Sequence, residues 1–227
     1  MEAPVARTSI ITTIHDFTAS MRLRLLALLS FAAVSAAAQD LTKPDAAKVA
    51  AVGPDSFNVK FTTTKGEFVV RVRRSWSPKG ADRLYYLFNA RYYDGVVFYR
   101  VVPGFMAQFG FNSDPKISAA WFNRTIPDEP VKVSNSRGTM SFAARGPSTR
   151  TTQLFINFGN NAQLDGMRFA PVASVVTGMA VVDSIYRGYG EGPDQGMITK
   201  DGNAYLKKAF PKLDAIVTAR VSQEWKK

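Results

Sequence analysis

Short runs in which apolar and polar residues alternate are the feature that most constrains the fold of this chain. Phe57, Val59 and Phe61 form one such run, and a second lies at 68–72 beyond a turn at Lys65-Gly66. Period-two alternation puts the apolar side chains on one face of a strand, and two such runs joined by a glycine turn indicate a β-hairpin. Further strand-like runs lie at 98–102, 105–109, 138–143, 153–157, 169–176 and 215–221.

Helical spacing of apolar residues is confined to two segments. One lies at 78–90, behind Ser77-Pro78, a pair that suits a helix N-cap followed by proline at the first helical position. The other lies at 179–186, and the polar stretches 112–137 and 188–211 are predicted to be loops. The pattern predicts a mainly β fold, a closed eight-stranded antiparallel β-barrel capped by two α-helices.

The absence of Cys and the near absence of His narrow the chemistry that the chain can perform. The 227 residues suffice for one domain with a sizeable core, but they include no Cys and only one His, His15. Disulfides, thiol nucleophiles, Ser-His-Asp triads and ordinary zinc sites are therefore excluded from the domain beyond this histidine. We expect neither a metal nor a cofactor.

The formal net charge is +11, and its basic residues are scattered along the chain. We interpret this as a solvated basic surface and expect no nucleic-acid partner. The alternative is a surface that binds nucleic acid or anionic membrane, which predicts steeply salt-dependent association.

The N-terminal region has the pattern of a secretory signal peptide at 21–38. A basic start at Met21-Arg22-Leu23-Arg24 precedes a short apolar run and small residues that end at Ala38. Because the run is too short to span a bilayer, which takes about 20 apolar residues, we expect cleavage near Ala38 and no stable membrane insertion. The product would be secreted or periplasmic.

The remaining boundaries follow from this assignment. Residues 1–20 fit no targeting pattern, so they are either an upstream stretch before a true start at Met21 or a real extension. Residues 39–54 are rich in Ala, Lys and Pro and are predicted to be a flexible lead-in. One domain is predicted over 55–223.

A lone cation stands out in the strand-like stretch at 98–110. Arg100 precedes a Pro103-Gly104 turn, and beyond the turn Met106 can supply an apolar wall and Gln108 an amide. A charge amid so much apolar surface is costly to bury unless it has a use. The alternative is a core hairpin with a snorkelling arginine.

Four linked motifs resemble the cyclophilin family of peptidyl-prolyl isomerases. The first and most specific is Phe-Tyr-Arg-Val-Val-Pro-Gly-Phe-Met-Ala-Gln at 98–108, and the others lie at 138–143, 153–156 and 164–166. Their order and spacing match the family. The resemblance implies the cyclophilin-like barrel and cis-trans isomerisation of Xaa-Pro bonds.

The resemblance also implies which residues form the site. Arg100 would be the catalytic cation, and Gln108 would form a hydrogen bond with the substrate backbone. Phe105, the third residue assigned to catalysis, would line the proline pocket. The implied substrate-binding residues are Met106, Ala143, Ala144, Gln153, Phe155, Leu164 and Phe169.

Three positions depart from the best-known eukaryotic members of the family. Gln163 stands where those members carry the Trp that is linked to cyclosporin binding, which puts such binding in question. Ala144 and Arg145 replace an Asn and a small residue, so the preference for residues beside the proline is expected to differ.

The sequence thus predicts a monomeric isomerase that acts on proline-containing unfolded or partly folded polypeptides and assists the folding of exported proteins. The alternative is a proline-peptide-binding module or chaperone with little turnover, because Gln163 and Arg145 alter the pocket rim. Measured exchange rates separate the two hypotheses.

Overall fold

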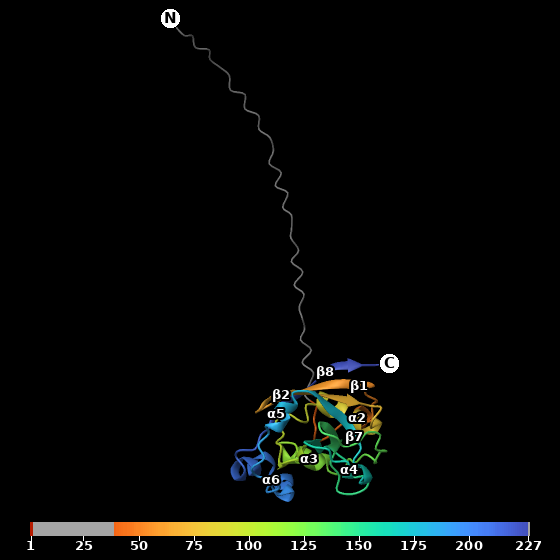
Figure 1. The fold of residues 1–227 in the computed structure, drawn as a ribbon. Helices are drawn as coiled ribbons and strands as arrows, with labels where there is room; N and C mark the ends of the chain where they lie inside the picture. The colour runs from red at the N-terminus through yellow and green to blue at the C-terminus, as the bar shows by residue number, and fades with distance from the viewer. Residues whose placement is uncertain (2–38, 227) are drawn as a thin grey trace. The chain divides into compact units, whose positions relative to one another are not determined.

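The computed structural model describes Met1 and residues 39–226, so the predicted signal peptide at 21–38 and nearly all of the segment 1–20 lie outside the described residues. Within residues 39–226, eight antiparallel strands form one sheet in the order β3-β4-β6-β5-β7-β2-β1-β8. Figure 1 labels β7, β2, β1 and β8 of this sheet. The strands are β1 Ser56–Thr63, β2 Gly66–Arg73, β3 Arg100–Val102, β4 Met106–Phe109, β5 Thr139–Phe142, β6 Leu154–Asn157, β7 Pro171–Thr177 and β8 Ile216–Trp225.

The predicted mainly β fold with eight antiparallel strands is confirmed, but closure of the barrel is not. β3 and β8 are the two edges of the sheet, and no ladder joins them. The segment before β3 reaches the start of β8 through a single bridge between Val97 and Ala215 and a few backbone hydrogen bonds, such as Phe98 N–H to Asp214 C=O at 2.9 Å. Because this register is antiparallel, the residues of β3 that follow Val97 face the chain before Ala215, which lies outside β8, so the contact does not become a ladder between β3 and β8.

Six helical segments occur in residues 39–226, not the two predicted. They are α1 Ala46–Val49, α2 Pro78–Asn89, α3 Pro115–Trp121, α4 Gln163–Gly166, α5 Met179–Asp183 and α6 Gln195–Ala209. The predicted helices correspond to α2 and α5, whereas α3 and α6 lie in stretches predicted to be loops. Asp114 and Asp194 cap α3 and α6 by accepting hydrogen bonds from first-turn N–H groups, which explains why these polar stretches are helical.

The N-terminus of α2 is capped by a residue distant in sequence. The side chain of Ser77 makes no capping bond and instead donates its hydroxyl to the carboxylate of Glu129. Glu129 accepts from the N–H groups of Lys79 at 2.8 Å and Gly80 at 3.2 Å, and also from Arg150 at 3.0 Å. Glu129 therefore takes the capping role predicted for Ser77 and ties α2 to the segment before β5.

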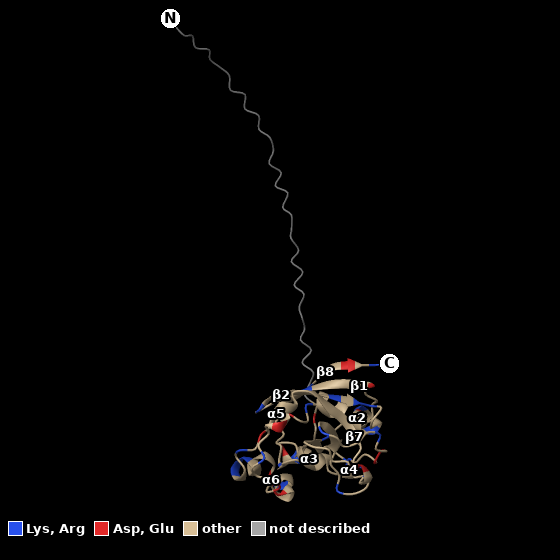
Figure 2. Ribbon diagram, viewed as in Figure 1, with Lys and Arg blue, Asp and Glu red and all other residues tan. Residues whose placement is uncertain are grey.

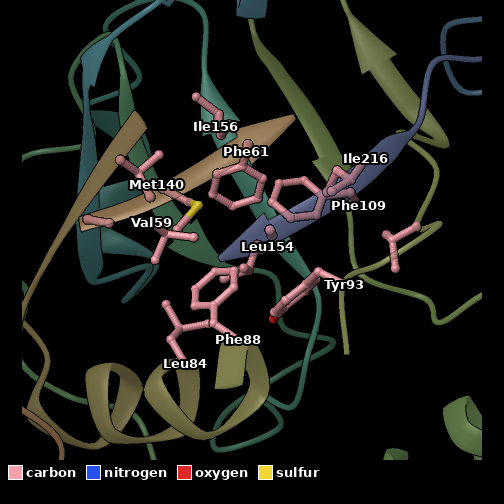
Figure 3. Packing of buried hydrophobic residues seen from close by; sticks show 14 of the residues in the cluster. Val59, Phe61, Leu84, Phe88, Tyr93, Phe109, Met140, Leu154, Ile156 and Ile216 are labelled. Carbon is pink, nitrogen blue, oxygen red and sulfur yellow. The ribbon is translucent and has the colours of Figure 1, made fainter. Parts of the chain in front are cut away.

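The core lies between α2 and the sheet, as Figure 3 shows. Leu84 and Phe88 project from α2 toward side chains of the strands, including Phe61 of β1 (Figure 3). The Phe61 ring meets the Phe88 ring edge-on at 5.6 Å and stacks on Phe68 at 4.7 Å. Burial of these apolar side chains fixes the sheet, and with it the register of the strands that carry the site.

Residues 39–54, predicted to be a flexible lead-in, include α1 and contact the domain, with Leu41 buried in the main hydrophobic cluster. The carbonyl of Leu41 accepts from Trp121 Nε1 at 3.0 Å, and Gly53 N–H donates to Asp82 at 2.9 Å. Among the described residues, no helix has the length and apolar character needed to cross a membrane.

The charged residues are interspersed along the fold. Figure 2 shows both basic and acidic positions scattered over the ribbon of residues 39–226. Several basic side chains pair with acids, among them Arg220 with Asp94 and Arg137 with Asp183, each at 2.6 Å. Part of the positive charge is therefore partnered within the domain.

Candidate active site

Strand register brings three of the predicted site residues into one row. Arg100 of β3 lies opposite Gln108 of β4, and Gln108 lies opposite Phe155 of β6. Residues directly opposite each other on antiparallel strands point to the same face, so all three side chains share one side of the sheet. Met106, two residues before Gln108, joins them on that side.

The opposite face of the same strands belongs to the core. Val101 and Ala107, which alternate with the site residues, are buried in the main hydrophobic cluster. The predicted Pro103-Gly104 turn joins β3 to β4, with Phe105 N–H donating to Val102 C=O at 3.0 Å. Gly104 has a φ of +73°, a left-handed conformation that glycine adopts without strain. One face of this hairpin therefore packs into the core, and the other carries the side chains of Arg100, Met106 and Gln108.

All the site residues named from the sequence line one cleft of about 240 Å³. This volume is close to the lower end of the roughly 300–1,000 Å³ typical of small-molecule pockets. The residues are Arg100, Phe105, Met106, Gln108, Ala143, Ala144, Gln153, Phe155, Leu164 and Phe169.

The floor of the cleft is apolar. Met106, Phe155 and Leu164 form a small buried cluster separate from the main core, with Phe105 and Phe169 packed against it. The rings of Phe155 and Phe169 meet edge-on, with centroids 5.7 Å apart. A compact apolar ring could bury its surface here without displacing any charged group.

Arg100 lies at the edge of this floor and is partly buried, with 29% of its side chain exposed. Its Nη1 donates to Gln108 Oε1 at 3.1 Å and lies 3.9 Å from the sulfur of Met106. Its Nε donates to Glu191 at 2.7 Å, and its Nη2 also contacts that carboxylate. The guanidinium is thus oriented into the cleft, unlike the snorkelling arginine of the alternative interpretation.

A buried hydrogen-bond network fixes the amide of Gln108. Its Nε2 donates to the Tyr99 hydroxyl and to Gln153 Oε1, the latter at 3.2 Å, while Tyr99 also donates to Gln153. Burial raises the pKa of Tyr99 well above its ordinary value, which keeps the hydroxyl protonated and able to donate. Because its amide nitrogen is engaged, Gln108 presents its oxygen toward Arg100 and the cleft.

Comparison with known proteins identifies the family to which this arrangement belongs. Residues 58–202 match the family model described as cyclophilin type peptidyl-prolyl cis-trans isomerase/CLD. The chain is a member of the cyclophilin family. The resemblance inferred from its motifs is therefore confirmed, and the chain is an isomerase of this class.

Two bacterial relatives extend this match. The chain is 36% identical over 154 residues to peptidyl-prolyl cis-trans isomerase A of Dickeya dadantii, covering 64% of this chain and 80% of that protein. It is 34% identical over 134 residues to a probable peptidyl-prolyl cis-trans isomerase of Brucella abortus, covering 54% of this chain and 68% of that protein.

The fold also matches a solved structure. The crystal structure of a cyclophilin type isomerase from Cryptosporidium parvum superposes with a TM-score of 0.55 at 18% identity. The match covers 74% of this chain and 99% of that protein. It supports a cyclophilin-like fold for the described residues.

In this cyclophilin, a buried asparagine holds the far wall of the cleft. Asn135 Nδ2 donates to the carbonyl of Phe169 at 2.7 Å and to Asp165 at 2.7 Å, and its oxygen accepts from the Ser141 hydroxyl at 2.8 Å. Asp165 follows Leu164 in α4, so Asn135 fixes both Phe169 and Leu164. Burial alone would raise the pKa of Asp165, but bonds from Ser134 and Asn135 outweigh it and lower the pKa.

Replacing Asn135 with Ala is expected to lower the free energy of unfolding by roughly 1–3 kcal/mol, because it leaves several buried polar groups without partners. Urea unfolding measures the loss. Asn89→Ala is the matched control, since the Asn89 side chain is exposed and bonds only a local carbonyl, and it should change stability little. Equal stability of the Asn135 variant and the wild type would contradict the assigned role.

Some lining residues were not recognised as site residues from the sequence. Phe122 directly follows α3 and Gln195 begins α6, and both helices were predicted to be loops. Arg145, noted only as a departure from the family pattern, places its Cζ 3.9 Å from the Phe122 ring centroid at the rim. The N-cap signals at Asp114 and Asp194 could have revealed both helices, although not their approach to the cleft.

No three His, Asp or Glu side chains in residues 39–226 are grouped closely enough to hold a metal ion. The polar groups of the cleft are instead the guanidinium groups of Arg100 and Arg145, amides and hydroxyls. Such a site can bind a backbone, grip an apolar ring and direct positive charge at one atom, without a nucleophile or a proton carrier.

Proposed function

We propose that this cyclophilin accelerates cis-trans exchange of Xaa-Pro bonds by stabilising the twisted amide with Arg100. Rotation about an amide must overcome a barrier of about 18–20 kcal/mol, so uncatalysed exchange takes tens of seconds or longer. At the twisted geometry conjugation is lost and the proline nitrogen gains lone-pair density. A donor directed at that nitrogen stabilises the twisted form more than either planar form, which is the condition for catalysis.

The observation that carries this proposal is the guanidinium of Arg100 beside the apolar floor of the cleft. The Met106, Phe155 and Leu164 cluster offers a place for the pyrrolidine ring, and Nη1 of Arg100 lies 3.9 Å from the Met106 sulfur. An arginine suits the role because it stays charged and its planar fork is rigid.

The other cleft residues would bind the peptide on either side of the ring. Phe105 and Phe169 would close on the ring, and Gln153, Ala143 and Ala144 would run along the peptide backbone. Gln108 would engage the backbone through its oxygen, by accepting an N–H, because its nitrogen is already bonded to Tyr99 and Gln153.

A protease-free exchange assay on an Ala-Pro peptide tests the proposal. The exchange rate is expected to rise in proportion to protein concentration and to remain at the buffer rate with heat-denatured protein. A rate equal to that of buffer, measured while the peptide is bound, would instead support the alternative of a binding module or chaperone with little turnover.

We further propose that the substrates are proline-containing unfolded or partly folded exported proteins, and that the protein, as a monomer, assists their folding in the periplasm or outside the cell. Support comes from the signal-peptide pattern at 21–38. A cleft open at the surface would admit an extended chain but not a folded domain.

Export predicts a processed N-terminus. The protein recovered from the secretory compartment of its host is expected to have the mass of a chain that begins at Gln39. Intact mass spectrometry measures this. Recovery of an unprocessed chain from the cytoplasm alone would contradict the proposal on location and leave the isomerase proposal unaffected.

A further inference from the structure

Glu191 is the one acidic residue that contacts the guanidinium of Arg100 among the described residues. Its Oε1 accepts from Nε at 2.7 Å and also contacts Nη2. These two nitrogens form one edge of the guanidinium fork. Nη1, which lies outside this edge, points to Gln108 and Met106 inside the cleft.

The backbone around Glu191 is held in place next to β3. Val101 N–H, one residue after Arg100, donates to the carbonyl of Gly190 at 3.1 Å. A tight turn encloses Glu191, with Gly192 N–H donating to Tyr189 C=O at 2.8 Å. The ring of Tyr189 packs edge-on against Phe210, with centroids 5.1 Å apart. The segment 189–192 is therefore fixed beside β3, and it holds the Glu191 carboxylate next to Arg100.

From this geometry we infer that Glu191 is a positioning residue for the isomerase reaction, which holds the outer edge of the Arg100 guanidinium so that Nη1 faces the proline nitrogen. The inference rests on the proposed function of Arg100. It assigns a role to a segment that lies 91 residues further along the chain and that the sequence motifs do not include.

Two opposing effects of Glu191 must be weighed. Its negative charge offsets part of the positive charge that Arg100 directs at the amide, which would slow the reaction. However, 63% of the Glu191 side chain is exposed, so water screens this effect. The orienting hydrogen bonds act at contact distance and are lost when the carboxylate is removed. We therefore expect orientation to dominate.

The test is the exchange assay with Glu191→Ala and Glu191→Gln. The Ala variant is expected to lower kcat by roughly two- to fivefold, the size of an exposed ion pair, with KM nearly unchanged because Glu191 lies on the solvent side of the guanidinium. The Gln variant should lose less, because its amide oxygen still accepts from Nε. Asp183→Asn, which weakens the exposed pair with Arg137 outside the cleft, is the matched control and should leave kcat unchanged.

A second background shows whether Glu191 acts through Arg100. Lysine lacks the Nε edge, so Glu191→Ala should have a smaller effect on kcat in an Arg100→Lys protein. An equal loss in both backgrounds, or an unchanged or raised kcat in the single Ala variant, would overturn the inference. Either result would overturn only the role of Glu191, and the proposed function would still hold if Arg100→Ala loses activity. Full activity of Arg100→Ala refutes the proposed function instead.

Discussion

Replacing Glu129 with Ala is expected to lower the free energy of unfolding by roughly 3–5 kcal/mol, as for other buried ion pairs that lose one partner. Arg150, with only 2% of its side chain exposed, would lose its nearer carboxylate partner at 3.0 Å and keep only the more distant Asp128 at 3.9 Å. The N–H groups of Lys79 and Gly80 would lose their acceptor as well. Denaturant unfolding monitored by circular dichroism measures the change.

Two further variants test this account of Glu129. Glu67→Ala removes a carboxylate from the exposed pair with Lys60 and should change stability little. Glu129→Ala should cost less in an Arg150→Met background, because no buried charge is then left unpaired. If Glu129→Ala is as stable as the wild type, Glu129 does not hold α2 in the way described.

Stability is also expected to depend on pH through Glu129. Burial alone would raise its pKa, but bonds from Ser77 and Lys79 and the charge of Arg150 outweigh it and lower the pKa below the ordinary value. The stabilisation is therefore fully present above the ordinary pKa of a glutamate and is lost as the pH falls through the lower value of the folded state. Unfolding free energies measured from neutral pH into this acidic range should fall more for the wild type than for Glu129→Gln.

Replacing Arg100 with Ala is expected to lower kcat/KM for Ala-Pro exchange by roughly 100- to 1,000-fold, the loss seen when one preorganised transition-state donor is removed. The reason is that Met106, Phe155 and Leu164 still bind the ring, but no positive charge faces the proline nitrogen. Exchange rates at low substrate concentration give this ratio directly.

Controls separate this loss from unfolding and from a general effect of charge. Arg137→Ala removes an exposed arginine outside the cleft and should keep the wild-type rate. The Arg100 variant should unfold at a denaturant concentration close to that of the wild type, since its side chain is partly exposed. A variant that folds normally and retains the wild-type rate would exclude Arg100 as the catalytic cation.

Much of the fold was accessible from local patterns, because alternation and helical spacing are local properties. The hairpin of β1 and β2 and helix α2 follow from the spacing of residues such as Phe57 and Leu84, and the structure confirms them. α3 was missed because it is short and lies in a long stretch that is polar overall. α6 was missed because many of its residues are polar and because Gly202 interrupts it, with a left-handed φ of +57° and no room for a Cβ beside Ser113. Closure of the sheet depends on contacts between distant segments, which alternation does not encode.

The same distinction applies to the site. The residues that the resemblance named line one cleft, and Arg100, Met106 and Gln108 lie together there because the Pro103-Gly104 turn joins β3 to β4 and sets their register. The contact of Glu191 with Arg100, the hub at Asn135 and the capping of α2 by Glu129 join segments that are remote in sequence. Nothing in the local sequence around these residues marks them as partners.

Exchange spectroscopy by NMR on one Ala-Pro peptide at saturation, with wild-type protein and with Arg100→Ala, tests the central claim most directly, since it yields both the rate of isomerisation within the complex and the dissociation constant. The account predicts that the rate within the complex falls by roughly 100- to 1,000-fold while the dissociation constant changes little. A higher dissociation constant with an unchanged rate in the complex would show that Arg100 contributes to binding of the planar substrate and not to catalysis. That result would contradict the account.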